Sequence, residues 1–108
     1  MIKMEKENEN VDKVLRLCEV LLKVDVKDAD GHLWMAWALE KKGDIKETGY
    51  AYKRAVEADP KREEAYAGLI KTYRAQGRLP ELVPYLERKA EKDPENEFLA
   101  KALEEIKP

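Results

Sequence analysis

The chain contains no serine, one cysteine (Cys18) and one histidine (His32) among its 108 residues. Without serine, catalysis by a serine nucleophile is excluded, and a single cysteine cannot form a disulfide within the chain. A structural zinc site takes four Cys or His ligands, so one of each is too few. We therefore expect no metal, no cofactor and a reducing, cytoplasmic location.

Long apolar runs and a large net charge are also absent. The longest apolar run, residues 33–39, is too short to span a membrane, and residues 1–6 lack the apolar region of a signal peptide. The 21 basic and 23 acidic residues leave a net charge of −2, which gives no bulk attraction to nucleic acid or to an anionic membrane. We expect neither as a partner. Abundant Lys and Glu with scarce Ser and Gln are typical of hyperthermophile composition.

What the chain has is a pattern that repeats at an offset of 34 residues, marked by Gly43 and Gly77 and by Pro60 and Pro94. Apolar residues recur at helical spacing and never convincingly alternate, which predicts an all-α fold. Residues 1–9, mostly charged or Asn, are expected to be disordered or frayed. The six predicted helices span residues 10–24, 29–42, 45–58, 62–76, 79–92 and 95–106.

Local signals set the ends of these helices. Asn10 is the expected N-cap of the first helix, and glycine at Gly43 and Gly77 can adopt the left-handed conformation that ends a helix. The segment 44–47, Asp-Ile-Lys-Glu, is typical of a capping box. Residues before a proline avoid the helical region, so helices should end before Pro60 and Pro94.

Residues 29–94 resemble the tetratricopeptide repeat, whose 34-residue pattern runs Trp-x2-Leu-Gly-x2-Tyr, Ala-x3-Phe, Pro. The matches are by residue class more than by identity. In the first repeat the family positions are occupied by His32, Met35, Ala36, Leu39, Thr48, Tyr52, Ala55 and Pro60. In the second they are occupied by Tyr66, Leu69, Ile70, Tyr73, Leu82, Leu86, Lys89 and Pro94. The resemblance divides a single domain, 10–108, into a half-repeat 10–28, repeats 29–62 and 63–96, and a capping helix 95–106.

The resemblance implies a right-handed solenoid of antiparallel helix pairs, in which the first helix of each repeat lines a concave groove. It implies a non-catalytic module that binds a partner peptide or helix. The alternative is a structural, self-associating unit or a piece of a larger assembly, because open solenoid ends expose apolar surface. The carboxylate clamp of chaperone-tail binders is absent, since its positions hold Leu33, Trp37, Gly68, Phe98 and Ala102.

Two sets of residues are candidates for partner binding. Trp34 and Trp37 either anchor an apolar side chain of a partner or fill the core. Lys71, Arg74 and Lys101 either receive a carboxylate or form an ordinary solvated face. The full predicted groove is Leu33, Trp34, Trp37, Glu40, Lys41, Lys71, Arg74 and Lys101.

Several single residues carry expectations about packing. Gly68, one repeat after Trp34, costs about 1 kcal/mol in mid-helix, which suggests that a tryptophan ring lies over it. His32 and Cys18 are expected in apolar packing, and the stem of Lys89 is expected to pack while its ammonium reaches water. No pair of carboxylates stands out for acid–base catalysis, so we expect no enzyme.

Overall fold

The computed structural model describes the backbone of residues 2–25 and 27–107 and the side chains of residues 10–25 and 27–107. Within these ranges the chain forms six α-helices and no strand, which confirms the all-α prediction. The predicted bounds of α2, α3 and α5 agree at both ends, and those of α4 and α6 differ by one or two residues. The helices are α1 (Ile2–Val24), α2 (Ala29–Lys42), α3 (Ile45–Ala58), α4 (Glu63–Ala75), α5 (Leu79–Lys92) and α6 (Glu97–Ile106).

The first helix is longer than predicted. It begins at Ile2, so the prediction of a helix start near Asn10 is wrong. Met1 lies outside the described residues. Residues 2–9 contain no Gly or Pro and are rich in Lys and Glu, which have good helix propensity. Asn10 lies inside the helix because nothing before it breaks the helix.

Glycine turns join α2 to α3 and α4 to α5 in the same way. Gly43 (φ 81°) and Gly77 (φ 68°) adopt the left-handed conformation, as predicted. In each turn the glycine N–H donates to a carbonyl three residues back, and the next N–H donates to one five residues back. The donors and acceptors are Gly43 to Glu40, Asp44 to Leu39, Gly77 to Arg74 and Arg78 to Tyr73.

The predicted capping box at Asp44 is half formed. The Asp44 carboxylate accepts a hydrogen bond from the Glu47 N–H (3.2 Å), which caps α3. The Asp44 N–H donates to the carbonyl of Leu39, so the preceding helix satisfies it in place of the Glu47 side chain. Asp44 therefore belongs both to the glycine turn that ends α2 and to the cap that begins α3. The helices α3 and α5 end at Ala58 and Lys92, before Asp-Pro in both cases, as predicted.

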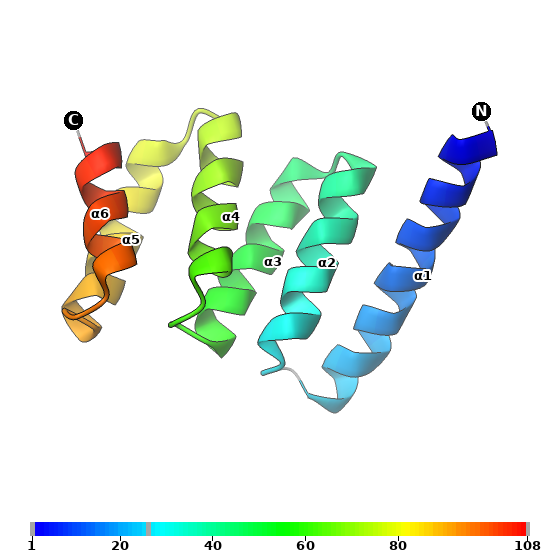
Figure 1. Cartoon of the computed structure of the whole chain (residues 1–108), viewed down its shortest axis with the longest axis horizontal. Helices are drawn as coiled ribbons and strands as arrows, with labels where there is room; N and C mark the ends of the chain where they lie inside the picture. Colours follow the sequence, from blue (N-terminus) through cyan, green and yellow to red (C-terminus); the bar gives the residue numbers. More distant parts are fainter. Residues whose placement is uncertain (1, 26, 108) are drawn as a thin grey trace.

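Successive helices pack against one another along the chain and form an elongated, thin body of 45 × 31 × 18 Å. In Figure 1, α2, α4 and α6 form the nearer layer and α3 and α5 lie behind them, with α1 at one end beside α2. Side chains join neighbouring helices of the nearer layer: Lys71 of α4 binds Glu40 of α2, and Tyr66 of α4 contacts Phe98 of α6. We call the surface of this layer the α2–α4–α6 face.

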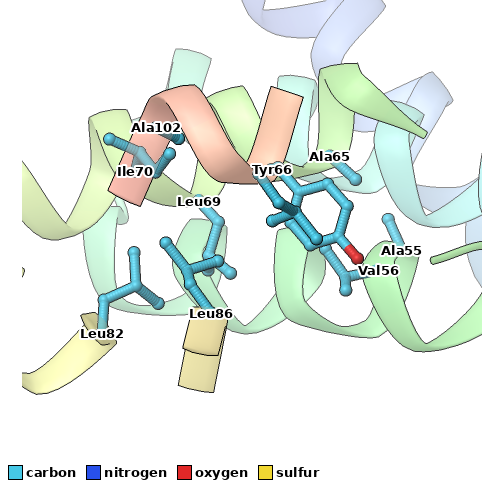
Figure 2. Close-up of a cluster of buried hydrophobic side chains, with 10 residues drawn as sticks. Ala55, Val56, Ala65, Tyr66, Leu69, Ile70, Leu82, Leu86 and Ala102 are labelled. Carbon is cyan, nitrogen blue, oxygen red and sulfur yellow. The ribbon is translucent and has the colours of Figure 1, made fainter. Parts of the chain in front are cut away.

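The main core lies where α3, α4, α5 and α6 meet (Figure 2). Tyr66 is buried there, and its hydroxyl donates a hydrogen bond to the Pro60 carbonyl at 2.6 Å. Burial raises the pKa of Tyr66 to about 12. The core residues are Ala55, Val56, Ala65, Tyr66, Leu69, Ile70, Leu82, Leu86, Leu99 and Ala102.

A polar cluster joins α3 to α5 in the rear layer. The Glu57 carboxylate accepts hydrogen bonds from the Tyr85 hydroxyl (2.7 Å) and the Lys89 ammonium (2.9 Å). These bonds lower the pKa of Glu57, the Tyr85 bond having the larger effect. The Lys89 side chain is 13% exposed, so its stem packs as expected, and its ammonium pairs with Glu57 in an exposed hydrogen bond.

The first helix has one buried and one exposed apolar face. Val11 and Cys18 are buried, and His32 on α2 is buried as well, as predicted. The exposed face lies at the spacing i, i+3, i+4, i+7, and its last residue, Val24, is 85% exposed. Its members, which we call the α1 stripe, are Leu17, Val20, Leu21 and Val24. Among the described residues, no helix is both long and apolar enough to cross a membrane.

Candidate functional site

A hollow of about 320 Å³ opens between α2 and α4. The rings of Trp34 and Trp37 stand edge to face there, with centroids 5.9 Å apart and planes inclined at 77°. Trp34 is 57% exposed, so it does not fill the core, and Trp37 is half-buried. We call this site the tryptophan hollow. It is lined by Asp30, Leu33, Trp34, Trp37, Tyr52 and Glu64.

Tyr52 reaches this hollow from α3, which belongs to the rear layer, because Gly68 leaves room for it. A β-carbon at Gly68 would overlap the Tyr52 ring. The ring over the bare backbone is therefore that of Tyr52, and the expectation of a tryptophan there is wrong. Glycine in mid-helix predicted a close approach at this position, but its partner comes from another helix. Burial, followed by the nearby Glu40 carboxylate, raises the pKa of Tyr52.

A second hollow, also of about 320 Å³, opens between α4 and α6. Three cations and one carboxylate line it, together with the apolar side chains of Ile70 and Phe98. The predicted set Lys71, Arg74 and Lys101 is thus brought together at one place. We call this site the basic hollow. Its lining residues are Ala67, Ile70, Lys71, Arg74, Phe98, Lys101, Ala102 and Glu105.

The two hollows lie on one face of the molecule, to either side of α4. Glu64, Ala67, Lys71 and Arg74 are all exposed and follow a spacing of three and four residues, which places them on one side of the helix. Glu64 lines the tryptophan hollow and the other three line the basic hollow. The α2–α4–α6 face is therefore continuous from one hollow to the other.

The charges of this face differ between its two ends. Only carboxylates, Asp30 and Glu64, bring charge to the lining of the tryptophan hollow, and Asp30 also pairs with Arg62. In the basic hollow, Lys71 is already paired with Glu40 at 2.9 Å, which raises the pKa of Lys71. Among the described residues, the ion pairs include neither Arg74 nor Lys101. These two side chains are the cations available to a ligand.

Of the remaining predicted site residues, Glu40 lines a smaller hollow of about 190 Å³ with Lys71, and Lys41 is exposed and lines neither named hollow. Tyr52, Glu64 and Phe98 also line these hollows, although they were not among the predicted site residues. Within the described part of the chain, no three His, Cys, Asp or Glu side chains converge to hold a metal ion.

Comparison with known proteins does not identify a family for this chain. No protein-family model matches the chain, and no curated protein matches it at a significant level.

Proposed function

We propose that the chain is a non-catalytic helical-repeat module of the tetratricopeptide type that binds a segment of another protein along the α2–α4–α6 face. The observation that carries the proposal is the pair of hollows on this one face, each wide enough for a side chain. Two further features support it: the 34-residue offset of the glycine turns, and helices that alternate between two layers. In this proposal the helices form antiparallel pairs in a right-handed stack.

The charges favour one orientation of the bound segment. An acidic side chain would pair with Arg74 and Lys101, since a guanidinium binds a carboxylate through two parallel hydrogen bonds. An apolar or cationic part of the segment would lie against Trp34 and Trp37, and large aromatic side chains dominate the energy of many interfaces. Affinity then comes mainly from the tryptophan hollow, and orientation from the basic hollow.

Selection of displayed random peptides on the chain tests this proposal. We expect the selected peptides to carry an acidic residue and to bind about tenfold more weakly to Trp37→Ala and to Arg74→Ala. The matched control is Arg88→Ala, because Arg88 is exposed on α5 in the rear layer. Titration calorimetry gives the affinities. Equal losses in all three variants, or a loss only with Arg88→Ala, would contradict the proposal.

A second candidate function is association of two copies through the α1 stripe. Four exposed apolar side chains on one helix favour it, because isolated exposed residues are common but a contiguous stripe marks a contact surface. We expect light scattering to give a dimer for the unchanged chain and a monomer for Leu21→Lys. Trp34→Ala should leave the dimer intact. An unchanged chain that stays monomeric at every concentration tested makes this candidate wrong.

A further inference from the structure

The tryptophan hollow combines aromatic faces with carboxylates. The planes of Trp34 and Trp37 are inclined at 77°. The two rings therefore form a corner whose two sides are aromatic. Tyr52 supplies a third aromatic side chain to the lining. Asp30 and Glu64 border the same hollow, and no cation is among its lining residues.

This combination suits a cation. The face of an aromatic ring carries partial negative charge and attracts a cation within about 6 Å of its centre, most strongly at tryptophan. The chain uses such contacts elsewhere: Arg78 lies over Tyr73 at 5.2 Å and Lys53 over Tyr85 at 4.9 Å. The cation–π contacts found among the described residues all involve Tyr73 or Tyr85. Among the described residues, none of these contacts places a cation over Trp34 or Trp37.

The shape of the corner selects the kind of cation. A planar guanidinium stacks on one ring, whereas a rounded ammonium contacts two perpendicular faces at once. Alkyl groups on the nitrogen enlarge it, weaken its hydration and spread its charge over methyl groups that pack on the rings. Arg62 already neutralises part of the Asp30 charge, so Glu64 is the carboxylate that contributes most to binding.

We propose that the tryptophan hollow binds an alkylated ammonium group, as carried by a methylated lysine side chain of the bound segment. The choice of a side chain over a free amine rests on the function proposed above. The same chemistry occurs in small quaternary amines, and the experiment separates the two sources. A neutral apolar side chain is the competing occupant, because the rings alone would hold it.

Choline and 3,3-dimethylbutan-1-ol form a matched pair of probes, alike in shape and different in charge. The chain has two tryptophans and both line the hollow, so tryptophan fluorescence reports on this site alone. We expect choline to change the emission in a saturable way, with an affinity about tenfold above that of the alcohol. Equal binding of the alcohol, or no saturable change with choline, overturns the proposal.

Two variants locate the contacts. Glu64→Gln should weaken choline binding severalfold and remove part of its salt dependence, while the isosteric amide preserves the shape. Trp34→Ala should abolish choline binding, with Trp37 left as the reporter, and it should fold because Trp34 is exposed. Arg88→Ala, on α5 in the rear layer, is the control and should bind choline unchanged. If Arg88→Ala and Trp34→Ala weaken choline binding alike, the proposed site is wrong.

A pair of peptides separates the two sources of the ammonium. Both carry an acidic residue for the basic hollow, and one has trimethyllysine where the other has norleucine. Tighter binding of the trimethyllysine peptide than of choline supports a side chain, and tighter binding of choline overturns that source. If both peptides bind equally and depend on Arg74, the groove function stands and this inference fails. If choline binds but neither peptide depends on Arg74, the ammonium site stands and the groove function fails.

Discussion

Leu69→Ala is expected to lower the free energy of unfolding by about 2–5 kcal/mol, the range found when a buried leucine is cut to alanine. Leu69 on α4 is fully buried in the core shared by α3, α4, α5 and α6. The body is only 18 Å thick, so few surrounding side chains can move in to fill the cavity that remains. Denaturant unfolding followed by far-ultraviolet circular dichroism measures the change.

Leu17→Ala is the matched control, since it deletes the same atoms from α1 at a position that is 63% exposed. At protein concentrations low enough to keep the chain monomeric, we expect a change within about 0.5 kcal/mol, as is usual for surface substitutions. Similar losses in the two variants at that low concentration would show that the core is placed wrongly. If α1 is covered by a second copy, the loss at Leu17 should grow with protein concentration.

Gly68→Ala is expected to destabilise the fold although alanine is the better helix former. The gain in helix propensity is about 1 kcal/mol, whereas adding a group to a filled space costs about 1–3 kcal/mol. The new β-carbon would overlap the ring of Tyr52, which must leave its place between α3 and α4. We expect a net loss of up to about 2 kcal/mol in the free energy of unfolding. A shift of the tryptophan emission should accompany it, because Tyr52 lines the same hollow.

Combining Gly68→Ala with Tyr52→Ala tests whether the Tyr52 ring causes this loss of stability. When Tyr52→Ala removes the ring, the overlap disappears and only the gain in helix propensity remains. Gly68→Ala should then stabilise the chain by up to about 1 kcal/mol. A change of sign between the two backgrounds is the expected result of the double-mutant cycle. The same loss in both backgrounds would mean that Tyr52 is not what requires glycine at this position.

Helix ends were predictable wherever a residue type forces them. Gly43 and Gly77 take a backbone conformation that penalises a β-carbon, and Asp59 and Asp93 precede prolines, so these ends follow from local sterics. The start of α1 was not predictable from Asn10, because asparagine favours a cap only where the chain before it leaves the helix. In residues 2–9 no such signal exists.

The site was predictable where its residues share a helix or a repeat position. Trp34 and Trp37 are three residues apart on α2, and Lys71 and Arg74 are three apart on α4, so each pair faces one way. The contribution of Tyr52 was not predictable in the same manner, because it depends on how α3 and α4 approach each other. A repeat pattern gives the order of helices along the stack, but it does not say which side chain passes between them.

The matching glycine turns also bear on how such a chain can lengthen. Residues 44–77 begin just after one left-handed glycine and end on another, and the backbone bonds around both are alike. A tandem copy of this segment would therefore enter and leave through a turn that the chain already makes. Gene duplication in steps of 34 residues would therefore require no new loop. Each added helix pair would need only a surface that packs against the neighbouring pair.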